Sequence, residues 1–147
     1  MARQARSLLP DGTFHVTARA GFEQLLFKDD DDRRTFLSLL KEFTTEFGLE
    51  CLAYCLMGTH YHLLLNGSAA DLSTAMRRLN GSYAHYFNER HDRRGHVFGQ
   101  RYTTRAVLTE KHLEELWRYI EENPLRSGLC APGTRWPWMW RYFDGTG

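Results

Sequence analysis

The chain has 147 residues, of which 42% are hydrophobic and 25% charged, values that fit one soluble globular domain with its own core. No apolar run approaches the ~20 residues that cross a bilayer, and the arginine-bearing N-terminus lacks the apolar stretch of a signal peptide. We therefore expect a cytoplasmic protein with no membrane partner. Three cysteines without a C-x-x-C pair argue against a disulfide framework and a structural zinc site.

The net charge of +1 conceals an uneven distribution of charge along the chain. Residues 21–50 hold eight acids against four bases, whereas residues 77–105 hold seven arginines against two acids. Arginine makes up 16 of the 19 basic residues, and its guanidinium binds phosphate through two hydrogen bonds and stacks on bases. The pattern is compatible with a nucleic-acid-binding face or with a solvated surface that uses arginine by chance.

The first half of the chain predicts a strand, a helix and two more strands. Residues 13–20 alternate apolar and polar side chains, which is typical of a half-buried strand. The acids Asp29–Asp32 favour a helix N-terminus, apolar residues follow at helical spacing, and Gly48 lies at the expected C-cap. Residues 49–57 and 59–65 are apolar and strand-like, and a turn signal follows them.

The second half begins with a predicted helix. Asp71 is expected to cap it, and an apolar stripe at helical spacing continues to Phe87. A basic loop at 91–95 and a strand within residues 97–108 follow, with an irregular start near Gly99.

A final helix is predicted from about Glu110 to Glu122. It should end before Pro124, because proline disfavours helical geometry at the residue that precedes it. Residues 131–147 contain three tryptophans and are expected to pack over the sheet.

The element order β-α-β-β-α-β-α predicts an α+β, ferredoxin-like fold with an antiparallel sheet and an additional C-terminal helix. The helices should cover one face of the sheet and leave the other face or its rim for a ligand. Because no repeat or linker interrupts the chain, we expect a single domain over 1–147, with a core at about 10–130 and a tryptophan-rich tail at 131–147.

His60 and His62 are two residues apart in the third predicted strand, so their side chains should project in parallel from one face. Two such imidazoles can hold one metal ion, although two ordinary histidines in a half-buried strand explain the motif equally well. Tyr119 and Asn123 are four apart and share one flank of the last helix. A tyrosine at a helix edge and a helix-terminating asparagine remain the alternative interpretation.

Five segments of the chain, taken together, resemble one protein family. They are FHVTAR at 14–19, YCLMGTHYHLLL at 54–65, LNGSY at 79–83, GHVFGQRY at 95–102 and YIEENPLRSG at 119–128. The family is that of the single-tyrosine HUH transposases, and its REP-associated tyrosine transposase branch is the most similar. The resemblance covers roughly residues 10–130, in order and with similar spacing.

The resemblance implies a metal-dependent DNA transposase that acts as a site-specific single-stranded DNA endonuclease and strand transferase. Tyr119, on the C-terminal helix, would be the nucleophile and would form a 5′-phosphotyrosine link. His60, His62 and Asn123 would bind Mg²⁺ or Mn²⁺. The chain departs from the family at Gly58-Thr59, where Pro-Asn is more usual. A monomer and a homodimer both remain open, as does the target of the enzyme.

The arginine-rich region would then bind the DNA backbone, and aromatic side chains would stack on unpaired bases of single-stranded or hairpin DNA. The DNA-binding candidates are Arg77, Arg78, Arg93, Arg94, Arg101, Arg105, Arg126 and Tyr102, with Phe98 and His96 as further stacking residues. Two other functions remain open: a nucleic-acid-binding module whose chemistry has lapsed, and a metal-dependent hydrolase of small phosphate esters.

Overall fold

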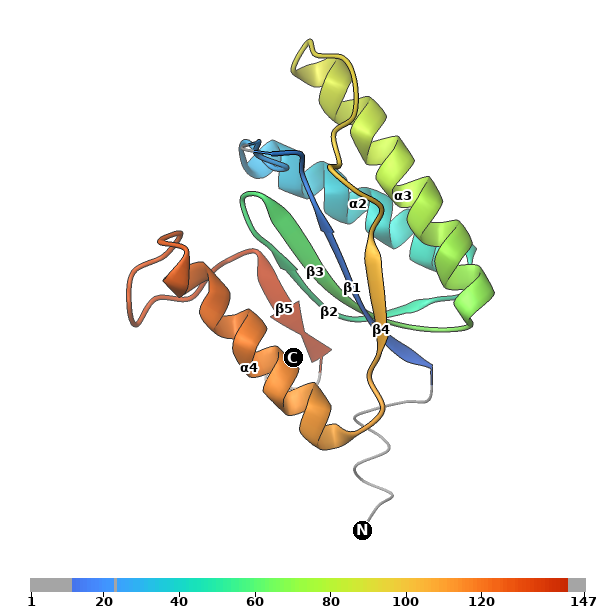
Figure 1. Cartoon of the computed structure of the whole chain (residues 1–147), viewed down its shortest axis with the longest axis vertical. Coiled ribbons are helices and arrows are strands. Elements are labelled where there is room, and N and C mark those ends of the chain that lie inside the picture. Colours follow the sequence, from blue (N-terminus) through green and yellow to red (C-terminus); the bar gives the residue numbers. More distant parts are fainter. Residues whose placement is uncertain (1–11, 23, 143–147) are drawn as a thin grey trace.

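The computed structural model in Figure 1 describes residues 12–22 and 24–142. Its elements are β1 (Thr13–Arg19), α2 (Asp30–Glu46), β2 (Glu50–Leu56), β3 (His60–Asn66), α3 (Ala69–Arg90), β4 (Thr103–Ala106), α4 (Glu110–Arg126) and β5 (Met139–Arg141). The strands pair antiparallel in one sheet with the order β4-β1-β3-β2-β5. The α+β, ferredoxin-like prediction with an added C-terminal helix is confirmed, and β5 is a strand that the prediction lacked.

The centre of the sheet is the pairing of β1 with β3. Thr17 lies opposite His62 and Arg19 lies opposite His60, while on its other edge β1 places His15 opposite Arg105 of β4. Residues directly opposite each other in an antiparallel pair share a face of the sheet. The polar residues of β1 therefore lie on the same face as the two histidines of β3.

Two separate cores form, one on each face of the sheet. The larger core packs α2 and α3 against one face, where Val16 and Tyr61 are fully buried. The smaller core packs α4 against the other face, where Trp117 and Ile120 meet Leu64. The expectation that all helices cover one face is therefore wrong, because the apolar stripe of α4 requires burial of its own. Only part of the second face remains open to a ligand.

The ends of two helices differ from the prediction. Ser68, not Asp71, caps α3, and its hydroxyl accepts a hydrogen bond of 3.1 Å from the N–H of Asp71. Serine is as good an N-cap as aspartate, and here the helix begins three positions earlier than the acid suggests. Pro124 also lies inside α4 and does not end it.

Pro124 is tolerated because it lies in the last turn of α4. It removes only one helical hydrogen bond, and the helix end is closed by the N–H of Ser127 donating to Asn123 O at 2.9 Å. The proline ring is buried, which offsets part of that loss. Asn123 consequently keeps helical geometry one turn after Tyr119.

The tail extends the sheet at the edge formed by β2. Trp140 of β5 pairs with Tyr54, and their ring centroids are 5.9 Å apart. The indole N–H of Trp136 donates to Leu56 O at 2.8 Å. The tail therefore lies beside the sheet instead of across it, and residues 143–147 lie outside the described part. Among the described helices, none is long and apolar enough to cross a membrane.

The strand predicted within 97–108 is shorter than expected. Regular pairing is confined to β4, and the preceding segment touches the sheet through an isolated bridge between Phe98 and Ala20. The irregular start near Gly99 is thus confirmed. The segment around Gly99 lines the two cavities that are described below.

Candidate active site

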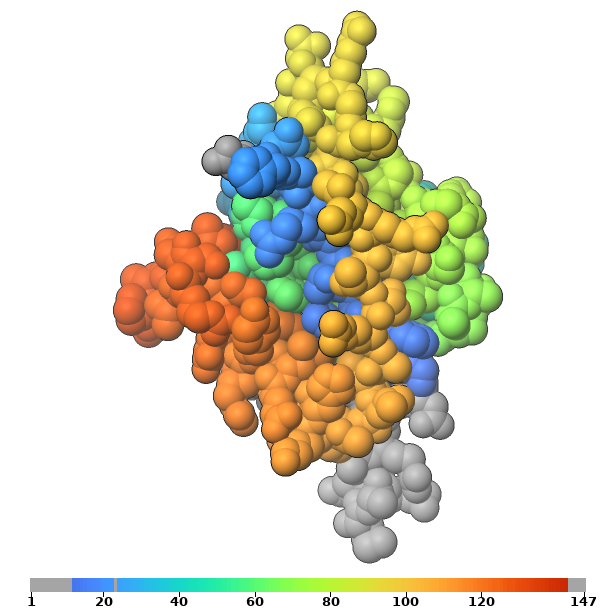
Figure 2. Space-filling view, viewed as in Figure 1, coloured from blue at the N-terminus to red at the C-terminus, as the bar shows by residue number. Residues whose placement is uncertain are grey.

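A cavity of about 890 Å³ opens between the sheet and the C-terminal half of α4. His60 and His62 from β3 and Tyr119 and Asn123 from α4 all line it. Figure 2 shows this face of the molecule, with residues of β1 visible between α4 and the segment that leads to β4. The four residues singled out from the sequence, which come from two segments more than fifty positions apart, therefore share one cavity.

His62 is held from both sides of its ring. Its Nδ1 lies 3.0 Å from Nε2 of His15, and its Nε2 lies 3.4 Å from the amide nitrogen of Asn123. Because an amide nitrogen only donates, Nε2 of His62 must accept, and the ring proton must be on Nδ1, where it is donated to His15. The imidazoles of His15 and His62 are also stacked, with ring centroids 5.3 Å apart.

His60 is oriented by the residue that precedes it. Its Nδ1 lies 3.0 Å from Oγ1 of Thr59, and that oxygen accepts a second hydrogen bond of 3.2 Å from Arg19. Within the described part of the chain, Nε2 of His60 makes no hydrogen bond. The rings of His60 and His62 are 5.1 Å apart but nearly perpendicular, at 80°, so the expectation of parallel imidazoles is wrong. The hydrogen bonds on the two Nδ1 atoms set these different ring angles.

All three histidines are neutral at pH 7. Burial, followed by the positive charge of Arg19, lowers the pKa of His60 to about 4. Burial lowers the pKa of His62 to about 3, with His60 as the next cause, and burial lowers the pKa of His15 to about 4. Neutral imidazole is the form that binds a metal ion, so the site needs no deprotonation to accept one.

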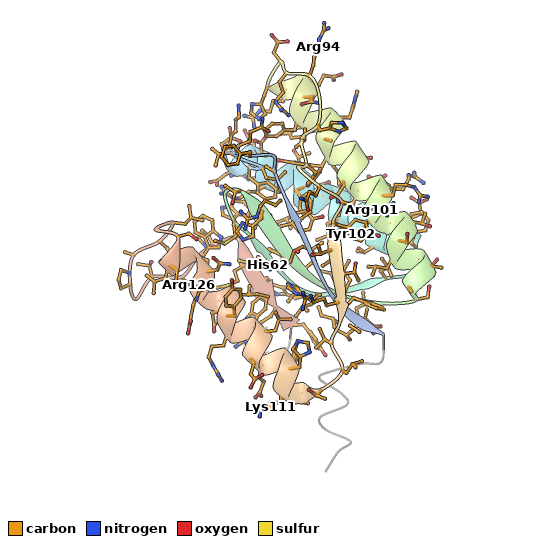
Figure 3. All side chains as sticks on the ribbon, in the orientation of Figure 1. His62, Arg94, Arg101, Tyr102, Lys111 and Arg126 are labelled. Atoms are coloured by element: carbon orange, nitrogen blue, oxygen red, sulfur yellow. The ribbon has the colours of Figure 1, made fainter. Side chains whose placement is uncertain are left out.

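Tyr119 is exposed and lies under the guanidinium of Arg126. The centre of that guanidinium is 4.6 Å from the centroid of the tyrosine ring, and Arg126 also donates to Tyr119 O at 3.0 Å. A second bond of 3.1 Å joins Arg126 to Glu122. Arg126 therefore restrains Tyr119 from the last turn of α4, and Figure 3 shows it at that end of the helix.

Three of the proposed DNA-binding residues gather at a second cavity, of about 670 Å³, between α3 and the segment before β4. They are Arg77, Arg101 and Tyr102, and Arg101 lines the first cavity as well. Arg105 lies on β4 opposite His15, on the same face as the histidine pair. Arg101 and Arg105 therefore lie near the histidine pair, whereas Arg77 and Tyr102 lie beside α3 and the larger core.

The other arginine candidates lie elsewhere. Arg78 lies over the ring of Phe43 at 5.2 Å and near Glu46 of α2. Arg93 donates to Asn88 at 2.9 Å within the loop after α3, and Arg94 is at the tip of that loop in Figure 3. The structure therefore does not bring Arg78, Arg93 or Arg94 to either cavity.

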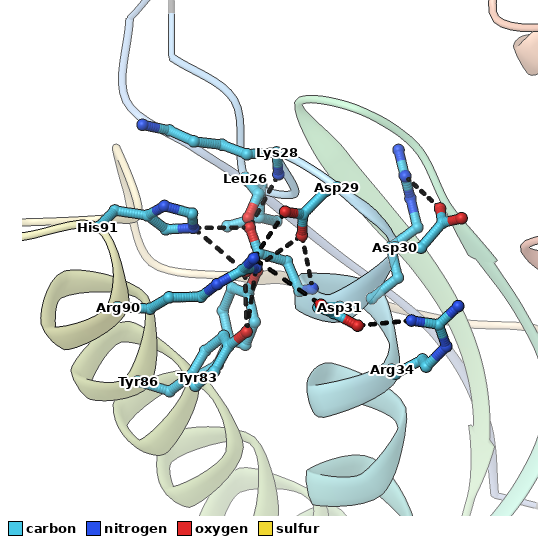
Figure 4. Close-up of polar contacts among 12 residues, drawn as sticks. Leu26, Lys28, Asp29, Asp30, Asp31, Arg34, Tyr83, Tyr86, Arg90 and His91 are labelled. Carbon is cyan, nitrogen blue, oxygen red and sulfur yellow. Dashed lines mark hydrogen bonds and ion pairs between the residues drawn. The ribbon is translucent and has the colours of Figure 1, made fainter.

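A further part of the arginine-rich region holds two helices together. The carboxylate of Asp32 is fully buried and accepts hydrogen bonds from Arg90 at 2.7 Å, His91 at 2.9 Å and Tyr86 at 2.9 Å. Figure 4 shows these side chains converging from the end of α3 on the start of α2, where Arg90 also binds Asp29. Arg90 is thus a structural residue with fixed partners.

Sequence reasoning did not identify His15 as part of the site. The alternation of β1 placed His15 on the polar face with Thr17 and Arg19, and a ferredoxin-like strand order puts β1 beside β3. These two signals together could have found it.

Within the described residues, no group of three or more His, Cys, Asp or Glu side chains is arranged to hold a metal ion. The expected set of ligands contains only two such residues, with the amide of Asn123 as the third.

The fold and the shared cavity have the arrangement expected of a single-tyrosine transposase. Residues 10–123 match the family model described as Transposase IS200 like, and the chain belongs to that family. A REP-associated tyrosine transposase bound to a REP hairpin has a similar structure, with a TM-score of 0.72, 17% identity, and coverage of 87% of this chain and 75% of the other.

A putative transposase from Deinococcus radiodurans R1 is also similar, with a TM-score of 0.52 and 20% identity over 75% of this chain and 88% of the other. At these identities the two structures show a shared fold. No curated protein matches the chain. The family resemblance inferred from the sequence is confirmed, and a role in transposition follows from membership of the family.

Proposed function

We propose that this protein cuts and rejoins single-stranded or hairpin DNA through Tyr119, with a divalent cation bound by His60, His62 and Asn123. The observation that carries the proposal is the single cavity lined by all four side chains. A histidine pair alone would be compatible with many sites. A tyrosine and an amide one helical turn apart, facing that pair, match the implied chemistry of the family.

The residues present fit a divalent ion. Both histidines are neutral, and each has its Nδ1 hydrogen-bonded to a neighbour. Nε2 is therefore the atom of each ring that can bind the metal ion. Asn123 already contacts Nε2 of His62, and a half-turn of its amide would present oxygen in place of nitrogen. Mn²⁺ accepts imidazole more readily than Mg²⁺, which prefers oxygen ligands, so Mn²⁺ is the first ion to test.

The reaction is a transesterification at phosphorus. A bound divalent ion would supply charge stabilisation to the phosphate oxygens. The phenolic oxygen of Tyr119 forms a bond to phosphorus while the bond from phosphorus to the 3′ oxygen breaks. The phenol loses its proton, and the departing 3′ oxygen takes one up as a hydroxyl. Because the phosphodiester energy is kept in the tyrosine ester, a 3′-hydroxyl can reverse the step without a nucleotide cofactor.

The charges around the cavity suit a nucleic acid. Arg19 and Arg101 line it, and Arg105 lies on the same face of the sheet. Guanidinium groups bind phosphates through paired hydrogen bonds and favour a polyanion over a small ester. The similar REP-associated tyrosine transposase was solved with a REP hairpin, and we extend a hairpin ligand to this chain as part of the proposal.

Covalent trapping tests the proposal directly. Labelled hairpin DNA with single-stranded flanks is incubated with the protein and Mn²⁺, and a denaturing gel reports any protein–DNA adduct. The wild type should form one and Tyr119→Phe should not, because the phenylalanine ring lacks the attacking oxygen. Tyr54→Phe is the matched control, since Tyr54 lies under Trp140 at the far edge of the sheet, and it should react like the wild type.

An adduct that survives in Tyr119→Phe would show that another residue is the nucleophile. Hairpin binding without any adduct, whichever divalent ion is supplied, would instead identify a nucleic-acid-binding module that has lost its chemistry.

A further inference from the structure

The second cavity lies between α3 and the segment that leads to β4, and its lining is chemically mixed. Met76, Phe98 and Tyr102 provide apolar and aromatic surface, whereas Arg77 and Arg101 provide two guanidinium groups. A small apolar ligand would not use the two positive charges, and a phosphate backbone alone would not use the aromatic surface. The combination suits one unpaired nucleotide, whose base stacks on an aromatic ring while its phosphates meet the arginines.

Asn80 adds a group that can contact the edge of a base. Its Oδ1 accepts a hydrogen bond of 2.7 Å from the hydroxyl of Tyr61, which is fully buried in the larger core. That bond fixes the orientation of the amide and commits its oxygen. Because Asn80 lines the cavity, its Nδ2 group is then a donor of fixed direction for an acceptor on a base.

The two cavities share one wall, a short segment that is hydrogen-bonded to the sheet. Gly99, Gln100 and Arg101 line both of them. The N–H of Gly99 donates to Arg19 O at 3.0 Å, and a Cβ at this position would come within 3.1 Å of Gly21 Cα. The segment is thus attached to the end of β1, next to the strand that carries the histidines. The distance between the two cavities is set by backbone hydrogen bonds rather than by a free loop.

On the basis of the proposed function, we propose that the second cavity binds one unpaired nucleotide of the strand that reacts at Tyr119. The segment 99–101 would then fix how many nucleotides separate this base from the reacting phosphate. The enzyme would select its cleavage position partly by counting along the strand from the bound base.

An abasic scan tests this subsite. In EDTA, so that no reaction occurs, the dissociation constant is measured by fluorescence anisotropy for oligonucleotides in which each nucleotide in turn lacks its base. The wild type should show one position at which base removal weakens binding by about tenfold, as expected for loss of one stacked base. In Tyr102→Ala this penalty should disappear, because the ring that stacks is absent. Tyr54→Ala, at the opposite edge of the sheet, should keep the penalty.

Adjacent arginines provide a second comparison. Arg77→Gln and Arg78→Gln change the net charge equally, but only Arg77 lines the cavity, whereas Arg78 packs against Phe43 of α2. Arg77→Gln should reduce the affinity for the intact oligonucleotide more strongly than Arg78→Gln does. Equal effects, or a penalty in the abasic scan that persists in Tyr102→Ala, would overturn the subsite.

The same oligonucleotides, given Mn²⁺, separate this inference from the proposed function. The site of the adduct should lie at a constant number of nucleotides from the base-sensitive position in strands of different length. An adduct without any base-sensitive position, or with a variable offset, contradicts the subsite and leaves the nucleophile in place. A base-sensitive position without an adduct contradicts the proposed chemistry and leaves the subsite in place. Absence of measurable binding contradicts both.

Discussion

Thr59 occupies the position where the family more often has an asparagine, and its hydroxyl makes two side-chain hydrogen bonds. It is hydrogen-bonded to Nδ1 of His60 and accepts a hydrogen bond from Arg19. A hydrogen bond on the second nitrogen of a ligating imidazole fixes the ring and raises its basicity. The departure from the family pattern therefore replaces one polar group with another that can orient His60.

Removal of that hydroxyl should weaken metal binding. We expect Thr59→Val to lower the affinity for Mn²⁺ by about 10- to 100-fold, the usual effect of losing a partner of a metal-bound histidine. Isothermal titration calorimetry with the DNA-free protein measures this without any reaction. Thr59→Ser keeps the hydroxyl and should bind Mn²⁺ like the wild type. If Thr59→Val also binds like the wild type, the threonine does not orient His60.

The sequence allowed the proposed catalytic residues to be placed, but not all of their neighbours. Strand alternation puts His60 and His62 on one face, and helical spacing puts Tyr119 and Asn123 on one flank, but their proposed roles came from the family resemblance. The contact between His15 and His62 joins residues 47 apart and needs the strand order. A local pattern cannot supply that order.

The contacts that individual arginines make could not be predicted from the sequence, for the same reason. Arg78 is next to Arg77 in the sequence and Arg90 lies on the same helix, yet both contact α2 through interactions that only the folded chain creates. The predicted helix end before Pro124 was wrong because a proline in the last turn of a helix costs little stability. The ring of Pro124 is also buried. Apart from β5, the element types were therefore predictable, whereas their ends and tertiary partners were not.

At the scale of elements, the contact between α2 and α3 depends on one buried carboxylate. Burial raises the pKa of Asp32, but hydrogen bonds from the N–H of Lys28, His91, Arg90 and Tyr86 outweigh it, and the net pKa lies below its usual value. Asp32→Ala would leave cationic and hydroxyl groups without their acceptor. We expect a loss of about 3 kcal/mol in the free energy of unfolding, the usual effect of breaking a buried ion pair from one side.

Urea denaturation measures that loss, and Glu46→Ala is the control. Glu46 also joins α2 to α3, through an ion pair of 3.8 Å with Arg78, but the side chains of Glu46 and Arg78 are 46% and 51% exposed. An exposed pair contributes little, so this variant should lose less than about 1 kcal/mol. Similar losses in the two variants would mean that the network around Asp32 does not hold the helices together.

At the scale of the whole molecule, acid should destabilise the protein in two stages. The pKa values of His15 and His60 fall from 6.5 to about 4 on folding, so the unfolded chain binds more protons below pH 6.5. The contribution of the two neutral histidines to the free energy of unfolding is fully present above pH 6.5 and is lost as the pH falls towards 4. Hydrogen bonds from Arg90 lower the pKa of Asp29 to about 2, so a second loss follows from about pH 4 downward.

Chemical denaturation of the metal-free protein at a series of pH values checks this prediction. The free energy of unfolding should decline between pH 6.5 and 4, and then again below pH 4. His15→Leu removes one of the titrating groups and should show a shallower first decline. A free energy that stays constant from pH 7 to pH 4 would contradict the burial of neutral histidines.

We propose that the chain acts as one domain and that residues 131–142 of the tail belong to the folded unit. Within that tail, β5 pairs with β2, and Trp136 donates to Leu56 O. A chain that ends at residue 134 would leave the edge of β2 unpaired, and an unpaired edge is a template for association. It should lose stability to urea and show a mass that rises with concentration in light scattering. A chain that ends at residue 142 keeps β5 and should match the full chain.

The first six residues of β3 are all buried, and their side chains point alternately to the two faces of the sheet. Tyr61, Leu63 and Leu65 belong to the larger core, and the residues that alternate with them include His60 and His62. Insertion or deletion of one residue here would send both imidazoles into the apolar layer and bring Tyr61 into the cavity. This strand can therefore change over evolution by substitution but not in length, and variation in chain length is left to the loops.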